Sequence, residues 1–138
     1  MFQRFRSTSL VATAALLLGL TTAENRAAAQ IAPHVQALAS PIAQVRMQAA
    51  RELGRANDSA AVQPLMGALD DENAAVRREA AKALGFLNDA RAAEALIAAL
   101  DDEDADVRMY AAYALGEIRA PSAANPLLEA MGDPAWRV

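Results

Sequence analysis

The chain has 138 residues, the size of one domain, and its net charge of −4 disfavours binding to phosphate backbones, so we expect no nucleic-acid partner. It contains no cysteine, which excludes disulfides, thiolate metal sites and a cysteine nucleophile. Hydrophobic residues make up 54% of the chain and aromatic residues only 4%, so alanine and leucine supply the apolar content and favour close-packed helices over a sheet.

Residues 1–23 have the three-part pattern of a secretory signal peptide. Arg4 and Arg6 precede an uncharged stretch from Leu10 to Leu20, and small residues follow. The apolar stretch is shorter than the roughly 20 residues that a membrane-spanning helix needs. We therefore expect cleavage after Ala23, or after Ala29 as the second site, and a mature chain in the periplasm or outside the cell, free of the membrane. An uncleaved anchor and an ordinary helix are the alternatives.

A 31-residue repeat follows a short linker at residues 24–30. Its first half, V-R-x-x-A-A-x-x-L-G, begins at Val45, Val76 and Val107, and Val138 begins a truncated fourth unit. Each copy predicts a first helix with one apolar face, formed in the second unit by Val76, Ala80, Ala81 and Leu84. The glycines at positions 54, 85 and 116 suit left-handed caps at the ends of these helices.

A second helix with apolar positions at i, i+3, i+4 and i+7 follows in each unit. Asp58 and Asp89 stand at its N-cap, and Pro121 suits its first turn. Pro64 and Pro126 predict a bent or late-starting helix, because proline removes a backbone donor. The register extends back over residues 31–39, which we expect to form a lone second helix. The apolar positions are Val62, Leu65, Met66 and Leu69; Ala93, Leu96, Ile97 and Leu100; and Ala124, Leu127, Leu128 and Met131.

The signature V-R-x-x-A-A-x-x-L-G, followed by N-D and then by x-L-φ-x-A-L-D-D-E (φ apolar), resembles the short HEAT-like repeats named after phycobilisome lyase subunits. The resemblance covers residues 31–138. It implies an all-α fold, a right-handed α-α superhelix of the HEAT/armadillo-like solenoid class. About three helical hairpins would be flanked by a partial unit at each end, with the second helices on the concave side. Such repeats occur in bilin lyase subunits, in deoxyhypusine hydroxylase and in scaffolds.

No catalytic constellation is visible. The chain lacks a serine–histidine–aspartate set, a glycine-rich phosphate loop and zinc-ligand spacing, so we expect no catalytic residue, cofactor or metal. His34 is the only histidine and stands where later units have leucine, which favours a core position over a ligand. Deoxyhypusine hydroxylase holds di-iron with His-Glu pairs, and this chain has no such pair, which disfavours that activity.

The acidic run around residues 101–106 imitates the opening of a calcium loop. Val107 replaces the glycine that such a loop requires, and Tyr113 replaces its bidentate glutamate. Capping of the next helix by Asp102, Asp104 and Asp106 is therefore favoured over a weak cation site.

Arginine recurs at the second residue of each first helix, at positions 46, 77 and 108. A cation there is unfavourable for the helix dipole. We expect ion pairs with the acidic turns of neighbouring units, at residues 70–72 and 101–106. A ligand-binding arginine stripe is the alternative.

The expected function is that of an exported, non-catalytic scaffold for protein–protein interaction. Its partner, a protein or peptide, would meet small or polar outward positions of the second helices, which suit an extended segment. Met109, Tyr110 and Tyr113 replace polar residues of the second unit, which favours packing against the loops of the adjoining unit; a further contact patch is the alternative. The outward positions are Gln36, Gln63, Gly67, Glu94, Ala98, Asn125 and Glu129.

Two other functions are open. The chain could be an N-terminal accessory repeat segment of a longer exported enzyme, or a bilin-lyase-like, enzyme-associated subunit. Residues 132–138 align with the turn that opens the next unit, so Leu127, Leu128 and Met131 would be exposed on their C-terminal side. Repeat arrays end in polar caps. We therefore expect the repeat to continue beyond Val138, or the chains to associate end to end.

Overall fold

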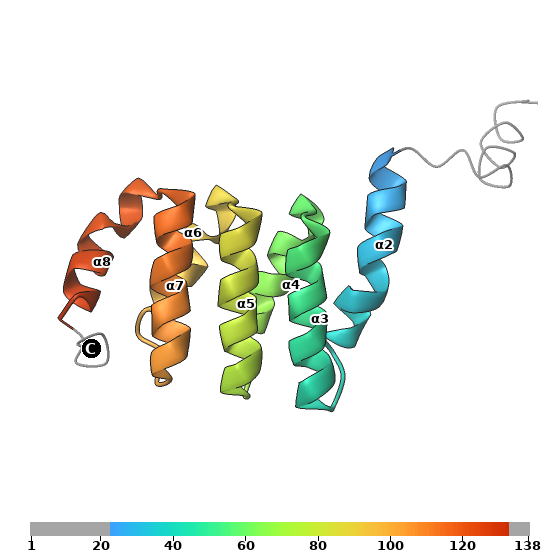
Figure 1. Ribbon diagram of the computed structural model, residues 1–138, viewed down its shortest axis with the longest axis horizontal. Coiled ribbons are helices and arrows are strands. Elements are labelled where there is room, and N and C mark those ends of the chain that lie inside the picture. The colour runs from blue at the N-terminus through green and yellow to red at the C-terminus, as the bar shows by residue number, and fades with distance from the viewer. Residues whose placement is uncertain (1–22, 133–138) are drawn as a thin grey trace, which may run out of the picture.

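The computed structural model describes residues 23–132, with side chains from Arg26 onward. Within this range the chain forms seven α-helices and three short 3₁₀ helices, with no strand. The elements stack side by side along one axis (Figure 1), which confirms the all-α superhelical class. None of the described helices combines the length and hydropathy that a membrane crossing requires. The predicted signal peptide up to residue 22 and the truncated unit at Val138 lie outside the described residues.

The 31-residue units appear as three helical hairpins preceded by one helix. Each hairpin has a 14-residue first helix, a 3₁₀ turn and a 7-residue second helix, and α2 (Ala23–Ala37) precedes them. The elements are α3 (Ala43–Ala56), η1 (Ser59–Ala61) and α4 (Val62–Ala68); α5 (Ala74–Leu87), η2 (Ala90–Ala92) and α6 (Ala93–Ala99); and α7 (Ala105–Ile118), η3 (Pro121–Ala123) and α8 (Ala124–Ala130).

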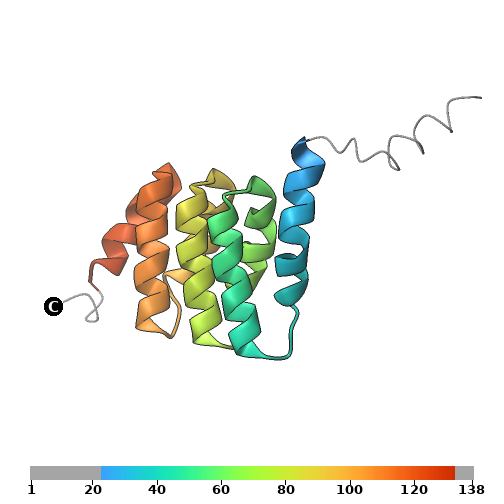
Figure 2. The same cartoon turned by 45° about the vertical axis from the view of Figure 1, so that its right-hand side comes forward.

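The first helices form one layer and the second helices lie behind it. In Figures 1 and 2, α3, α5 and α7 stand side by side, α4 and α6 lie behind them, and α2 and α8 stand at opposite ends. The predicted apolar face is confirmed, since Val76, Ala80, Ala81 and Leu84 are all fully buried between the layers. Val45 is 40% exposed, unlike Val76, because only the single helix α2 precedes its unit.

The predicted role of the repeated glycines is wrong. The first helices continue past them and end in left-handed residues three positions later, at Asn57, Asn88 and Arg119. Glycine instead permits close helix packing. A Cβ atom on Gly54 would lie 2.7 Å from the Cβ of Ala83, whereas one on Gly116 would meet nothing within 4 Å.

The entry into each second helix follows the sequence prediction. The side chains of Asp58 and Asp89 accept hydrogen bonds of 2.9 Å from the backbone N–H groups of Ala60 and Arg91, which start the 3₁₀ turns. Pro121 opens the third such turn. Because the 3₁₀ turn comes first, the α-helix starts late and Pro64 falls in its first turn, where a missing donor costs little.

The lone helix at the N-terminal end is longer than predicted. It runs from Ala23 to Ala37, so the expected linker at residues 24–30 is instead helical, and the helix ends two residues before the predicted boundary at residue 39. The physical reason is composition, because the segment from Glu24 to Gln30 consists mainly of alanine and other strong helix formers.

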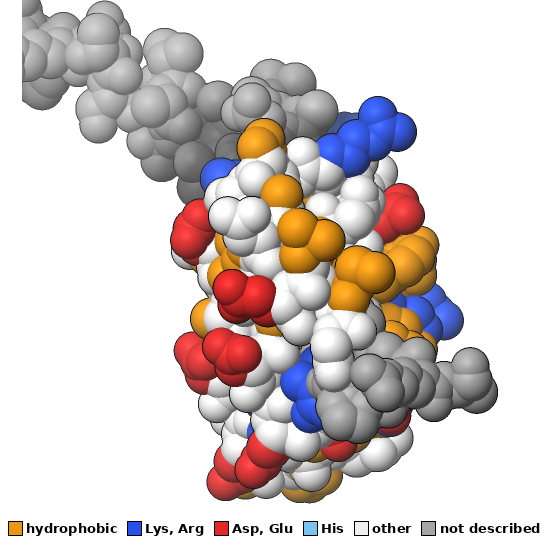
Figure 3. All heavy atoms as spheres, turned by 90° about the vertical axis from the view of Figure 1, so that its left-hand side faces the viewer, with side chains coloured by type: hydrophobic (Ala, Val, Ile, Leu, Met, Phe, Trp, Pro, Cys, Tyr) orange, Lys and Arg blue, Asp and Glu red, His pale blue; other side chains and the backbone are white. Residues whose placement is uncertain are grey.

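The opposite end of the array exposes apolar side chains. Leu128 and Met131 are 66% and 69% exposed, and Leu127 is half-buried. Figure 3 faces this end, where hydrophobic side chains lie uncovered over α8 and its neighbour. End-to-end association through this end stays a prediction.

Candidate functional site

The predicted interaction positions on the second helices are all exposed. They form two rows, because residues of one row occupy the same position in successive units. The first row is Gln63, Glu94 and Asn125, and the second is Gln36, Gly67, Ala98 and Glu129. Together these two rows are called the second-helix surface below.

Two grooves lie between the helices that carry this surface. One, of about 360 Å³, lies between α2 and α4 and is lined by residues that include Val35, Leu38, Pro64 and Gly67. The other, of about 640 Å³, lies between α6 and α8 and is lined by residues that include Ile97, Leu100, Pro126 and Glu129. The four residues named for the groove between α6 and α8 stand two periods after those named for the groove between α2 and α4. The surface therefore carries a groove twice at equivalent positions. The walls between α2 and α4 are mainly apolar, whereas Asp101, Arg108 and Glu129 add charge to the groove between α6 and α8.

The tyrosines lie in the other layer, away from the second-helix surface. Tyr110 is half-buried against the core, and the Lys82 ammonium lies 5.8 Å from its ring centroid. Tyr113 is 51% exposed, next to the 44% exposed Met109. The structure thus divides the predicted contact residues between two faces.

The recurring arginines form the predicted ladder between neighbouring units. Arg46 donates to both carboxylate oxygens of Asp71 at 2.6 and 2.9 Å and to Glu72 at 3.1 Å. Arg77 repeats this geometry with Asp102 at 2.8 and 2.9 Å and with Glu103 at 3.2 Å. Both arginines are only 7% exposed, and their aspartate partners are almost as buried, whereas Glu72 and Glu103 are exposed.

Each ladder arginine also binds the turn before its own helix. Arg46 donates to the carbonyl of Ser40 at 2.9 Å, and Arg77 donates to the carbonyls of Asp71 at 2.9 Å and Glu72 at 3.3 Å. Arg108 binds the carbonyls of Asp102 and Glu103 in the same way. Bidentate pairing and carbonyl contacts compensate the burial of the guanidinium group.

The ladder perturbs the carboxylates that it holds. The hydrogen bond from Arg46 lowers the pKa of Asp71 below its usual value. At Asp102 burial raises the pKa, but the bonds from Arg77 and the Asp104 N–H outweigh burial, so that the pKa is lowered overall. These groups are structural carboxylates held in the charged form.

The calcium-like run is a capping structure. Asp104 accepts hydrogen bonds from the backbone N–H groups of Asp106 and Val107 at the start of α7. Asp102 pairs with Arg77, and Asp106 lies 3.3 Å from Arg78. The described part of the chain has no group of three or more histidine, cysteine or acidic side chains that could hold a metal ion. His34 is half-buried in α2, as the core interpretation predicts.

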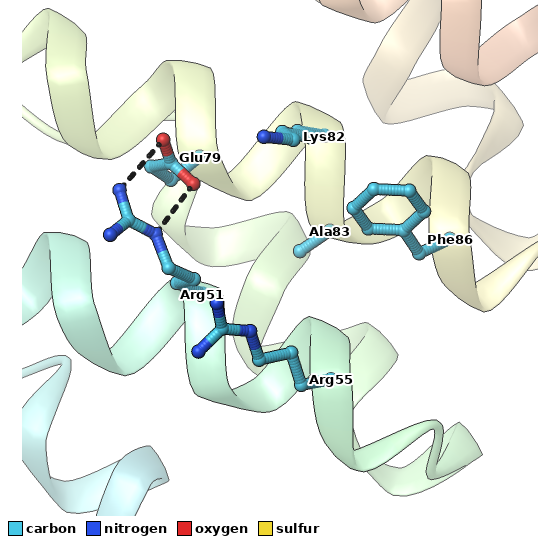
Figure 4. A pocket seen from close by; sticks show the side chains of 6 residues that line it. All are labelled: Arg51, Arg55, Glu79, Lys82, Ala83 and Phe86. Carbon is cyan, nitrogen blue, oxygen red and sulfur yellow. Dashed lines mark hydrogen bonds and ion pairs between the residues drawn. The ribbon is translucent and has the colours of Figure 1, made fainter.

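Sequence reasoning missed a hollow of about 460 Å³ in the first-helix layer, between α3 and α5. Its lining is Arg51, Arg55, Glu79, Lys82, Ala83 and Phe86 (Figure 4). Arg51 reaches from α3 across the joint between the two first helices and pairs with Glu79 of α5 at 3.2 and 3.3 Å. The two residues stand 28 positions apart, one helical turn less than the period, and this offset was the signal that could have revealed the pair.

Comparisons with known proteins agree with this architecture. The model of HEAT repeats matches residues 31–108 and residues 93–138. No curated protein matches the chain. A chain in the structure of the complex of CpcE and CpcF of phycocyanin lyase from Nostoc sp. PCC7120 is 34% identical, with a TM-score of 0.68 over 72% of this chain. An engineered protein is 26% identical, with a TM-score of 0.57 over 75% of this chain.

The matches cover only part of the two solved structures. This chain spans 41% of the length of the phycocyanin lyase chain and 51% of the engineered one. With a repeat model matched over residues 31–138, the chain belongs to the family of HEAT repeats.

Proposed function

We propose that this chain is an exported, non-catalytic HEAT-repeat scaffold that binds a protein or peptide partner along its second-helix surface. The observation that carries the proposal is the pair of equivalent grooves between α2 and α4 and between α6 and α8. Grooves that recur with the repeat suit an extended segment, which presents side chains at regular intervals. The exposed polar residues of these rows supply hydrogen-bond partners at the rim, namely Gln36, Gln63, Glu94, Asn125 and Glu129.

Gly67 offers a direct test of this surface. It lines the first groove, and a Cβ atom there would meet nothing within 4 Å, so Gly67→Gln fills the groove without disturbing the fold. Gly116→Gln is the matched control, since Gly116 is equally open but belongs to the first helix α7. Peptides selected from a random display library against the unaltered protein should lose binding to Gly67→Gln and retain binding to Gly116→Gln. Equal binding to both variants would remove the second-helix surface as the site.

The export part of the proposal rests on the leader pattern at residues 1–23. Cleavage after Ala23 keeps nearly all of α2, whereas cleavage after Ala29 removes about two turns of it. This favours Ala23. N-terminal sequencing of protein recovered from the cell envelope should start at Glu24, with Gln30 as the second choice. Intact Met1 on cytoplasmic protein would contradict export.

The 34% identity with a chain of the phycocyanin lyase complex favours one alternative, an enzyme-associated subunit that acts on bilin. That relative is part of a complex of two proteins, CpcE and CpcF. The discriminating measurement is visible absorption of the purified chain after incubation with a free bilin and gel filtration. A co-eluting bilin band supports the alternative, and its absence supports the scaffold.

A further inference from the structure

We propose that the hollow between α3 and α5 is a second binding site, which takes a small aromatic carboxylate. It lies on the first-helix layer and is independent of the second-helix surface. Three cations line it, Arg51, Arg55 and Lys82, against the single lining carboxylate of Glu79. In an acidic chain this is a local excess of positive charge beside an exposed aromatic ring, that of Phe86.

The cations keep donors available for a ligand. Arg51 uses Nε and Nη2 for Glu79, and Arg55 uses Nη1 for Glu52 at 3.1 Å. Within the described residues, Lys82 makes no hydrogen bond or ion pair, and its contacts are the faces of two rings. Its Nζ lies 6.0 Å from the Phe86 centroid and 5.8 Å from the Tyr110 centroid. Lys82 is half-buried as a residue, and an ammonium with three unused donors is suited to an anionic group.

The shape of the hollow selects the rest of the ligand. Ala83 is its small apolar floor, where α5 approaches Gly54 of α3 closely. Phe86 is 57% exposed at the wall, so its ring can stack against a ring of the ligand. A volume of about 460 Å³ falls within the range of small-molecule pockets. The joint between α5 and α7 differs, because Tyr110 and Tyr113 replace Glu79 and Lys82 there.

Lys82 also supplies a specific reporter, because it is the only lysine of the chain. Reductive methylation with ¹³C-formaldehyde keeps the charge and one N–H donor of Lys82, and it gives one side-chain NMR signal, distinct from that of the N-terminal amine. The full chain is titrated with phenylacetate, and separately with phenylacetamide, acetate and inorganic phosphate. We expect a saturable shift of the Lys82 signal with phenylacetate. Phenylacetamide, which lacks the charge, and acetate, which lacks the ring, should each bind about tenfold more weakly.

Two variants keep the reporter and remove one recognition element each. Arg55→Gln should weaken phenylacetate binding, and Phe86→Ala should abolish the preference for phenylacetate over acetate; both side chains are exposed, so the fold tolerates the changes. Arg91→Gln, an equal charge change outside the hollow, should leave binding unchanged. Linear, unsaturated shifts with every anion would overturn the proposal, as would phosphate binding as tight as that of phenylacetate.

Discussion

Lys82 and Tyr110 form a cation–π contact at the same two repeat positions where Arg51 and Glu79 form an ion pair. The Lys82 Nζ lies 5.8 Å from the ring centroid, and each residue stands 31 positions after its counterpart in the ion pair. Two successive joints of one array are thus closed by different interactions between the same sites. The joint between α3 and α5 keeps a charged hollow. Between α5 and α7 the ring of Tyr110 occupies the equivalent place.

The cation–π contact should be measurable as a coupling. A double-mutant cycle of Lys82→Met and Tyr110→Leu, followed by urea unfolding, should give an interaction free energy of about 0.5–1 kcal/mol. Pairing Lys82→Met with Gln63→Ala, on the second-helix surface, should give additive changes. A vanishing coupling for Lys82 and Tyr110 would mean that the contact contributes nothing to the joint.

The close approach of Gly54 to Ala83 predicts opposite effects at two glycines. Gly54→Ala places a Cβ 2.7 Å from the Ala83 Cβ and 3.0 Å from its Cα, so a backbone must move, and stability should fall by about 1–3 kcal/mol. Gly116→Ala meets open space inside a helix and should raise stability by up to about 1 kcal/mol. Thermal unfolding of both variants is the measurement, and a destabilised Gly116→Ala would contradict this account.

The first unit lacks a partner for one carboxylate oxygen. Asp58 Oδ2 is buried without a hydrogen bond, whereas in the next unit Arg91 binds both oxygens of Asp89 at 2.9 and 2.6 Å. Ala60 is exposed and occupies the position of Arg91 one period earlier. Ala60→Arg should therefore raise the urea midpoint at pH 7, and Ala60→Gln is the control. An unchanged midpoint for Ala60→Arg would show that water already satisfies Asp58.

Acid should weaken the array through its paired aspartates. Asp71, Asp89 and Asp102 all have pKa values below their usual value, and hydrogen bonds with Arg91 lower that of Asp89 to about 2. Groups with a depressed folded pKa stabilise the fold above their unfolded pKa of about 4, and that contribution is lost as pH falls through the folded value. Urea midpoints should therefore decline between pH 4 and about 2. Asp89→Asn should lower the urea midpoint at pH 7, and the midpoint of this variant should decline less between pH 4 and about 2 than that of the unaltered protein.

Leu84 should be among the most sensitive positions of the core. It is fully buried at the centre of the middle unit, and Leu84→Ala should cost about 2–5 kcal/mol through the cavity that it leaves. Leu128→Ala, at a position that is 66% exposed, is the matched control and should cost far less. Similar losses for the two variants would contradict the burial difference between Leu84 and Leu128.

The hairpins, their apolar faces and the arginine ladder were predictable because each repeats at a fixed interval. Val76 and Leu84 recur with the period, and so do Arg46 and Arg77 with the acids that they bind. The role of Gly54 was not predictable, because a glycine near a helix end suits both a left-handed cap and a close helix contact. Only the position of Ala83 on the neighbouring helix decides between them.

The hollow escaped prediction for a different reason. Arg51 and Glu79 meet because neighbouring first helices are offset by about one turn, so the two residues stand 28 positions apart. Aligning the units by the 31-residue period places Arg51 opposite Lys82 instead. The early start of α2 was also hidden, since residues 24–30 have no counterpart in the repeat and resemble the end of a leader.

The ladder bears on how such an array can change in length. The turn at Asp71 and Glu72 is held by Arg46 from the preceding unit and by Arg77 from the following one, so each joint is built from halves carried by different periods. Deletion of any 31 consecutive residues between Arg51 and Asp102 gives Arg46 and Asp102 the spacing of Arg46 and Asp71, and it gives Arg51 and Tyr110 the spacing of Arg51 and Glu79. Whole periods can therefore be duplicated or lost in the gene without separating a buried guanidinium group from its carboxylate, because every junction that results again carries both partners at the same spacing.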